Sequence, residues 1–194
     1  MGTNPKISES SAPPSTWVRR FLPLIGPGGL VLDLAAGSGR HSRLLRDSAF
    51  AVCAVDLDVS ALLPLAGPHC EVRQIDLESS AAWPLGNGYD GIVVTNYLHR
   101  PLLPAIGRAL APGGILIYET FALGNERFGR PQNPAFLLRL SELLDAFAML
   151  TVIAFEQGEI TTPRSAVIQR IAAIAGPLCR LPEAAGLDSR RSDE

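Results

Sequence analysis

The sequence predicts an α/β fold with a mostly parallel sheet, and three observations support this prediction. Short apolar segments alternate with segments of helical spacing along most of the chain. A glycine-rich loop follows the first apolar segment, as happens where a parallel strand turns into a helix. The last two apolar segments are joined by GEITTPRS, which suits a hairpin and is too short for a crossover helix. We therefore expect five parallel strands closed by an antiparallel hairpin.

The length and composition predict one globular domain. A chain of 194 residues is sized for a single domain, and 47% hydrophobic residues suffice for a packed core. Few apolar groups occur near either end, where Ser, Pro or charged residues dominate. We expect a disordered tail over residues 1–14, a folded domain over 15–180 and a flexible tail over 181–194.

The first half of the folded part supplies three strands. Ser15 or Thr16 caps a helix whose apolar stripe is formed by core residues such as Trp17 and Phe21. The strands expected next are residues 30–34, 50–55 and 71–75, and the last two end at Asp56 and Asp76. Helices are expected over residues 40–47 and 59–66.

The second half supplies the remaining strands and one long loop. Strands are expected over residues 90–95, 115–119, 149–155 and 166–174, and helices over 102–110 and 134–147. The turn Pro112-Gly113-Gly114 ends the first of these helices. The segment FALGNERFGRPQNP, residues 121–134, is long for a connection, so we interpret it as a functional loop or lid.

Charge, hydropathy and cysteine usage exclude several classes of protein. The net charge is -2 and the arginines are spread along the chain, which disfavours nucleic acid as a partner. No apolar run approaches the roughly 20 residues of a membrane span, and the N-terminus has no apolar signal segment, so we expect a cytoplasmic protein. The three cysteines form no CxxC pair, and we expect no metal site.

The stretch VLDLAAGSGRH, which begins at Val31, presents a strand, a glycine loop and a helix. Such a loop offers backbone N–H groups to a ligand. A Walker A loop needs a lysine, and the only lysine is Lys6, so that kind of triphosphate hydrolysis is excluded. A dinucleotide fingerprint aligns with Gly37, Gly39 and Ser42 and lacks its third glycine. Asp56 lies about 20 residues after the loop, where an acid binds ribose hydroxyls, so an adenosine ligand remains.

Asp33 favours one adenosine ligand over the others. An acid at the end of the first strand would repel a pyrophosphate and attract a cation. S-adenosylmethionine carries ammonium and sulfonium groups and no phosphate.

The stretch VLDLAAGSGR resembles motif I of the class I S-adenosylmethionine-dependent methyltransferases. YDGIVVTNYLHR is similar to the fourth motif of that family, and APGGILIYETF to its fifth strand. The resemblance covers about residues 17–176 and is greatest to small bacterial members of the tellurite-resistance type. It implies a Rossmann-like three-layer sandwich with a seven-stranded sheet, strand order 3-2-1-4-5-7-6, and an antiparallel last strand.

The resemblance also implies which residues bind the cofactor, S-adenosylmethionine. Asp33 would hold the loop and face the ammonium group, while Gly37 and Gly39 would lie behind the methionine end. Asp56 with Leu57 would bind the ribose hydroxyls, and Asp76 with Leu77 would bind the adenine amine. Asn96 and Tyr97 would face the sulfonium group. Ala35 stands where the family usually has its first glycine, and we expect a slightly reshaped loop that still binds.

Substrate contacts are expected near the carboxyl ends of the fourth and fifth strands. The candidates are Tyr97, His99, Arg100, Tyr118 and Glu119, and His99 is the candidate general base because imidazole titrates near neutrality. As alternatives, Tyr97 and His99 are half-buried residues at a helix start, and Asp56 caps the next helix.

Other polar residues carry weaker expectations. We expect His41 and His69 to be solvated. Arg127 and Arg130 in the long loop either pair with a carboxylate of the substrate or are solvated.

The sequence favours a small-molecule acceptor. Enzymes that methylate exocyclic base amines generally carry [DN]-P-P-[YFW] after the fourth strand, whereas this chain has Asn96-Tyr97-Leu98-His99. Two alternatives remain for the function. One is a non-catalytic partner subunit that binds S-adenosylmethionine or S-adenosylhomocysteine. The other is an NAD-dependent oxidoreductase, which the missing third glycine and Asp33 disfavour. The sequence leaves the oligomeric state open.

Overall fold

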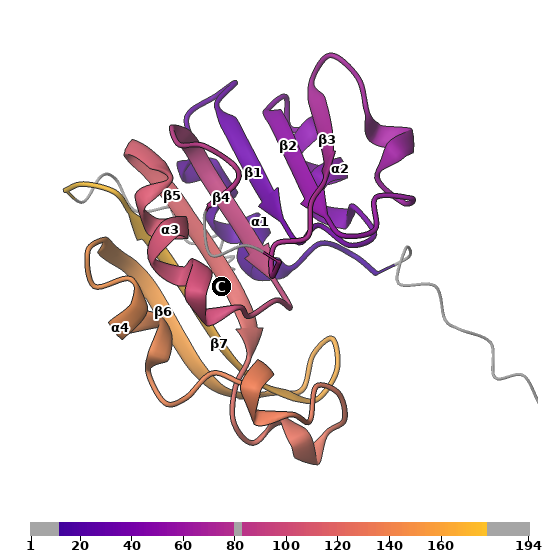
Figure 1. Ribbon diagram of the computed structural model, residues 1–194. Helices are drawn as coiled ribbons and strands as arrows, with labels where there is room; N and C mark the ends of the chain where they lie inside the picture. The colour runs from indigo at the N-terminus through magenta and orange to yellow at the C-terminus, as the bar shows by residue number, and fades with distance from the viewer. Residues whose placement is uncertain (1–11, 80–82, 178–194) are drawn as a thin grey trace, which may run out of the picture.

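The computed structural model describes residues 12–79 and 83–177 (Figure 1). Residues 1–11 of the expected N-terminal tail and the whole expected C-terminal tail, 181–194, lie outside the described residues.

A seven-stranded sheet forms the centre of the fold, in the order β3-β2-β1-β4-β5-β7-β6. The first five strands are parallel, and β7 runs antiparallel to both β5 and β6. The predicted order and the predicted antiparallel last strand are therefore confirmed. The strands are β1 Leu30–Leu34, β2 Ala51–Asp56, β3 Cys70–Gln74, β4 Tyr89–Thr95, β5 Leu110–Phe121, β6 Thr151–Ile160 and β7 Ala166–Ile174.

Helices cover both faces of the sheet and complete a three-layer sandwich (Figure 1). The α-helices are α1 Thr16–Phe21, α2 Arg40–Asp47, α3 Leu103–Arg108 and α4 Glu142–Ala146. Single turns of 3-10 helix are η2 Leu22–Leu24, η3 Leu63–Leu65, η4 Arg100–Leu102, η5 Asn125–Arg127 and η6 Pro134–Phe136.

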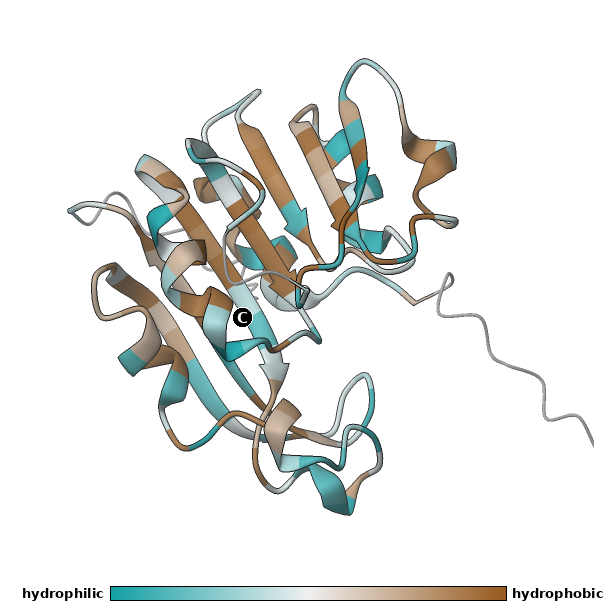
Figure 2. Ribbon diagram, in the orientation of Figure 1, coloured by the Kyte–Doolittle hydropathy of each residue, from teal (hydrophilic) through white to brown (hydrophobic). Residues whose placement is uncertain are grey.

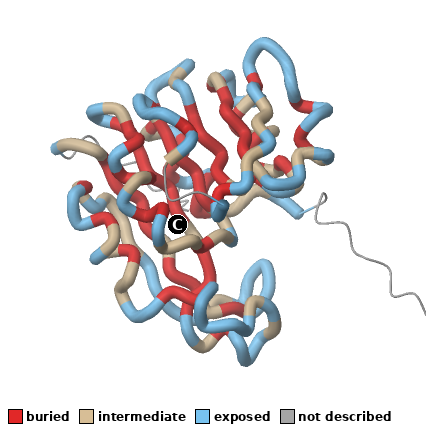
Figure 3. The backbone as a smooth tube through the Cα atoms, in the orientation of Figure 1, coloured by how far each residue is buried: buried red, intermediate tan, exposed pale blue. Residues whose placement is uncertain are grey.

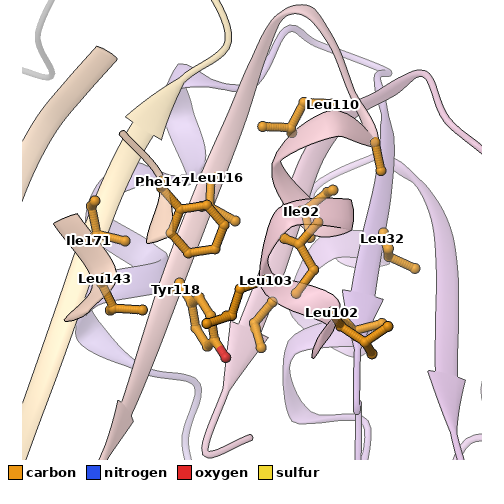
Figure 4. Close-up of a cluster of buried hydrophobic side chains, with 14 of the residues drawn as sticks. Leu32, Ile92, Leu102, Leu103, Leu110, Leu116, Tyr118, Leu143, Phe147 and Ile171 are labelled. Atoms are coloured by element: carbon orange, nitrogen blue, oxygen red, sulfur yellow. The ribbon is translucent and has the colours of Figure 1, made fainter. Parts of the chain in front are cut away.

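Two apolar cores lie on opposite faces of the sheet because alternate side chains of a strand point to opposite faces. Leu32 of β1 belongs to the core under α3 and α4, whereas its neighbour Val31 belongs to the core under α1 and α2. The central strands are accordingly mostly apolar (Figure 2) and mostly buried (Figure 3). Figure 4 shows the first core, where the rings of Tyr118 and Phe147 meet edge to face with centroids 5.8 Å apart.

Helix α1 joins the two ends of the described chain. Ser15 caps it by accepting a hydrogen bond from the Trp17 amide at 3.1 Å. The Trp17 indole N–H donates to the carbonyl of Ile171 in β7 at 3.2 Å, across 154 positions of sequence, and the Arg170 guanidinium lies 4.7 Å from the Trp17 ring centroid. Trp17 and Phe21 are buried, as expected.

Two predicted helices are wrong in extent. The helix expected over 59–66 is only the turn η3, because the Asp58 carboxylate accepts from the Ser60 amide and forms a turn there, and Pro64 has no N–H to donate. The helix expected over 134–147 is split into η6 and α4. Between these two pieces the chain is tied to β5, because the amide of Leu138 donates to the Phe121 carbonyl.

Strand β5 also begins earlier than predicted, at Leu110. The turn residues Pro112-Gly113-Gly114 are part of the strand and pair irregularly with β4. A Cβ at Gly114 would lie 2.6 Å from the Tyr89 carbonyl oxygen, so glycine allows the two backbones to approach this closely. The predicted hairpin of the last two strands is confirmed, with β6 extending to Ile160.

Candidate functional site

A cavity of about 480 Å³ lies at the carboxyl ends of β1 to β4, the edge at which ligands bind in open α/β sheets. Its lining residues are Ala35, Asp56, Leu57, Ile75, Asp76, Leu77, Glu78, Ser79 and Tyr97. Six of the ten residues expected to bind the cofactor therefore lie on one wall, and Asp33, Gly37, Gly39 and Asn96 do not.

The glycine loop beside the cavity has an unusual backbone. Ala35, Gly37 and Gly39 have φ values of 55°, 55° and 75°, all in the left-handed region. A Cβ at Gly39 would lie 2.8 Å from the Leu62 side chain, so glycine is required there for space as well as for conformation. Ala35 adopts the left-handed conformation that glycine favours, and its Cβ makes this conformation strained.

Asp56 links the loop to the end of β2. One carboxylate oxygen, Oδ2, accepts from the Gly37 amide at 2.7 Å, and the other, Oδ1, accepts from the Asp58 amide at 3.1 Å. The side chain therefore both fixes the loop and lines the cavity. The alternative role of Asp56 as the cap of a helix is wrong, because no helix follows β2 directly.

Asp33 is buried behind the loop, with an exposed fraction of 1%. Its carboxylate accepts a hydrogen bond of 2.5 Å from the Ser42 hydroxyl in α2. Burial raises the pKa of Asp33 to about 6, against the opposing effect of the Ser42 hydrogen bond. Asp33 therefore attaches the first turns of α2 to β1 beneath the loop.

Tyr97 presents a buried hydroxyl that has no hydrogen-bond partner among the described residues. Burial raises its pKa, and the nearby Glu78 carboxylate raises it further, so the hydroxyl keeps its proton at neutral pH. The backbone here is fixed, because the Tyr118 hydroxyl donates to the Tyr97 carbonyl at 2.8 Å and Asn96 has a φ of 57°. Because buried polar groups are normally hydrogen-bonded, this hydroxyl on the cavity wall is suited to donate to a polar atom of a ligand.

The charges on the cavity wall have one sign. Asp56, Asp76 and Glu78 contribute three carboxylates, and no Lys or Arg among the described residues lines the cavity. Such a wall attracts a cation and repels a pyrophosphate.

His99 lies beside this wall without lining it. Its Nδ1 is 3.9 Å from Oε2 of Glu78. Its side chain is half-buried at the start of η4, which agrees with the alternative interpretation of His99 as a half-buried residue at a helix start. An imidazole placed next to a carboxylate at the edge of a cavity is suited to accept a proton.

The other substrate candidates have partners elsewhere. Arg100 pairs with Glu142 through two hydrogen bonds of 2.6 and 2.9 Å and donates to two backbone carbonyls in the segment 134–142. Tyr118 is fully buried, and Glu119 accepts from the Ser15 hydroxyl at 2.9 Å and from Arg170 at 3.1 Å. The structure therefore uses all three to join elements around the site.

His41, near the start of α2, was predicted to be solvated, and that prediction is wrong. It is buried, its Nε2 accepts from the Ser15 amide at 3.0 Å, and its Nδ1 lies 3.3 Å from the Thr95 hydroxyl. Burial lowers its pKa to about 3, so the ring is neutral. Its spacing of four from Leu45 was the signal that it belongs to the buried face of α2.

Three lining residues were also missed: Ile75, Glu78 and Ser79. All three flank Asp76 and Leu77 in the sequence, so the signal was their position beside a predicted strand end.

The long loop is anchored at both sides. The buried Asn125 side chain donates to the Pro131 carbonyl at 3.3 Å and accepts from the Val167 amide at 3.2 Å. Arg127 pairs with Glu159 of β6 at 3.2 Å, and Arg130 is exposed.

Within the described ranges, no cluster of three or more His, Cys, Asp or Glu residues is arranged to hold a metal ion. No described helix is long and apolar enough to cross a bilayer.

Comparison with known proteins gives one family and several similar folds. A family described as "Methyltransferase domain" matches residues 9–140. A search of curated proteins gives no match. Among solved structures, TehB from Haemophilus influenzae is 18% identical with a TM-score of 0.65, over 81% of this chain and 60% of that one.

Two further solved structures are similar at comparable levels. The 1,6-didemethyltoxoflavin-N1-methyltransferase of Burkholderia thailandensis, solved with that compound and S-adenosylhomocysteine, is 21% identical with a TM-score of 0.61, over 83% of this chain and 76% of that one. The cyclase SpnF is 15% identical with a TM-score of 0.64, over 84% of this chain and 79% of that one. At these identities the likeness concerns the fold.

Proposed function

The chain belongs to the methyltransferase domain family, and from that premise we propose that it transfers a methyl group from S-adenosylmethionine to a small-molecule acceptor. The observation that carries the choice of cofactor is the cavity wall, to which residues 12–79 and 83–177 contribute three carboxylates and no basic side chain. A ligand with positive charge and no phosphate suits that wall, and a dinucleotide does not.

The residues present fit this cofactor. The cavity of about 480 Å³ falls within the range of small-ligand sites, about 300 to 1,000 Å³. In this proposal Asp56 and Leu57 hold the ribose, Asp76 and Leu77 hold the adenine, and the loop from Ala35 to Gly39 backs the methionine end. The unpartnered Tyr97 hydroxyl supplies a hydrogen-bond donor from the wall.

In the same proposal Asp33 and Asn96 act on the site without lining the cavity. Asp33 holds the loop through α2 and adds negative charge on the ammonium side. Asn96, with its left-handed backbone, turns the chain after β4 so that Tyr97 reaches the cavity.

The methyl group on the positively charged sulfur of S-adenosylmethionine is already activated for transfer. The protein therefore chiefly has to align the acceptor at about 3 to 3.5 Å and exclude water. For an acceptor that is protonated at working pH, His99 accepts the proton, held near Glu78 at the edge of the cavity. Arg100, Tyr118 and Glu119 would act mainly by positioning the elements that surround the acceptor.

Three observations support a small molecule as acceptor. The net charge is -2, the motif of base-amine methyltransferases is missing after β4, and a similar solved methyltransferase has 1,6-didemethyltoxoflavin bound. The loop 121–134 is the proposed cover of the acceptor, since it follows β5 directly and exposes the apolar side chains of Leu123 and Phe128.

Calorimetric titration with S-adenosylmethionine, S-adenosylhomocysteine and NAD tests the cofactor. We expect saturable binding of both sulfur compounds and none of NAD. Binding of NAD alone would overturn the proposal in favour of an oxidoreductase. Labelled S-adenosylmethionine with a panel of thiols, amines and carboxylates then tests transfer.

The second candidate is a non-catalytic partner subunit. A solved complex from Haloferax volcanii joins the Trm112 methyltransferase activator to a putative methyltransferase that is 17% identical to this chain, with a TM-score of 0.62 over 82% of this chain and 91% of that one. In that complex the similar chain is the putative methyltransferase, so the likeness favours the catalytic interpretation over this second candidate. Cofactor binding without turnover across the panel would favour this candidate.

A further inference from the structure

A second cavity, of about 240 Å³, lies between the segment that enters α1 and the outer side of α2. Its lining residues are Ala12, Pro14, Arg19, Arg40, Arg43, Leu44 and Asp47. It shares no lining residue with the cavity proposed to hold the cofactor.

Positive charge predominates in this second cavity. Three guanidinium groups and one carboxylate line it, which leaves a net charge of two positive. The carboxylate, Asp47, pairs with Arg46 at 3.0 Å, and Arg46 does not line the cavity. Within residues 12–79 and 83–177, none of the three arginines forms an ion pair. The described part of the protein therefore supplies no carboxylate in direct contact with any of the three guanidinium groups.

Two of the guanidinium groups are held in place by the backbone. Arg40 donates to the Pro13 carbonyl at 3.2 Å, and Arg43 donates to the Ser38 carbonyl at 2.7 Å. Each of these bonds uses one terminal nitrogen, Nη1, and leaves other N–H groups of the planar fork for a ligand. A pre-organised guanidinium loses little entropy when it binds, and its fork matches the oxygens of a phosphate.

We propose that this cavity binds a phosphate dianion, either inorganic phosphate or the phosphate group of a small monoester. The net charge of two positive matches the charge of a phosphate monoester, about -1.5 to -2 at neutral pH. A cavity of about 240 Å³ is smaller than the roughly 300 to 1,000 Å³ of sites for drug-sized ligands, so it suits the phosphate group rather than a whole nucleotide.

The bound anion also joins two parts of the fold. Arg19 belongs to α1 and the other two arginines belong to α2, so an anion among them bridges both helices. The entering segment is already attached to the rest of the protein, because Ser15 donates to His41 and to Glu119. An anion that binds the folded protein and not the unfolded chain raises the unfolding temperature by mass action.

Calorimetry and thermal unfolding of the full-length chain with inorganic phosphate test the site, at constant ionic strength set with sodium chloride. We expect saturable binding and a rise in the unfolding midpoint. Arg43→Gln and Arg19→Gln should each weaken phosphate binding about tenfold, since each removes charge-assisted hydrogen bonds. The exposed Arg19 side chain forms no hydrogen bond or ion pair within the described residues, so Arg19→Gln is the variant least able to disturb folding. Arg108→Gln, on the exposed side of α3, is the control and should bind as the wild type does.

A parallel titration with glycerol phosphate identifies the source of the anion: tighter binding than inorganic phosphate indicates a monoester, and weaker binding indicates the free ion. Three results would overturn the proposal: no saturable phosphate binding, equal binding by wild type and Arg19→Gln, or an equal loss in Arg108→Gln. Binding of a single-stranded oligonucleotide without binding of phosphate would also overturn it, in favour of an extended surface. None of these measurements needs S-adenosylmethionine, so they stand apart from the test of methyl transfer.

Discussion

Replacing Ala35 with glycine should stabilise the protein, although glycine usually weakens folded structure. Ala35 has a φ of 55°, and a left-handed backbone costs an L-residue about 1 to 2 kcal/mol. Glycine removes that cost but adds about 0.4 to 1 kcal/mol of freedom to the unfolded chain. The lost methyl group is partly buried and contributes about 0.3 kcal/mol, a fraction of a buried CH₂. The expected net gain is about 0.5 kcal/mol, or about 1 to 2 °C in Tm.

Thermal unfolding followed by circular dichroism measures this change, with two comparison variants. Ala49 follows α2 with a φ of 64° and an exposed side chain, so Ala49→Gly should gain about 0.8 kcal/mol without touching the cavity. Ala36 is buried and is not in the left-handed region, so Ala36→Gly should lose about 1.5 kcal/mol. If Ala35→Gly and Ala49→Gly both lower Tm, the strain argument is refuted. A loss in Ala35→Gly alone would refute it for the glycine loop.

Three further predictions concern the loop acid, the buried acid and the ion pair after β4. Asp56→Ala should weaken S-adenosylmethionine binding in calorimetry by about 1 to 3 kcal/mol, because it also frees the Gly37 amide, while unchanged affinity would remove Asp56 from the site. Because burial raises the pKa of Asp33 from 3.8 to about 6, the folded state binds the proton more tightly, and wild-type stability falls as pH rises between these values. Urea unfolding should show a fall of about 2 kcal/mol from about pH 4 to about pH 7 that Asp33→Asn lacks, and parallel pH profiles would contradict this. Arg100→Gln should cost about 2 kcal/mol in the same assay because it strands a partly buried carboxylate and two carbonyls. Arg139→Gln, with a side chain 72% exposed, should cost under about 0.5 kcal/mol, and equal losses would refute the distinction.

Residues whose role depends on local pattern were predictable from the sequence. Ala51–Asp56 and Ala166–Ile174 are apolar runs between turn residues, so their strands were found nearly to the residue. Asp56 and Asp76 were placed at one edge of the sheet because parallel strands end at the same edge, and both line the cavity.

Residues whose role depends on distant partners were not predictable in the same way. The helix expected over 134–147 has suitable periodicity, but Leu138 pairs with β5 and the buried Gln169 accepts from the Leu143 amide. His41 looked solvated because its partners, Ser15 and Thr95, are separated from it by 26 and 54 positions. Local periodicity carries no information about such contacts.

The contact between Trp17 and Ile171 can form only late in the synthesis of the chain. The two residues are 154 positions apart, and a ribosome adds about 5 to 20 residues per second, so Trp17 waits roughly 8 to 30 s for its partner to be synthesised. During that interval the indole and the apolar side of the first helix have no β7 to cover them, and they are available to a chaperone or to a neighbouring nascent chain. The apolar side of the first helix is therefore covered only after β7, the last strand, has been synthesised.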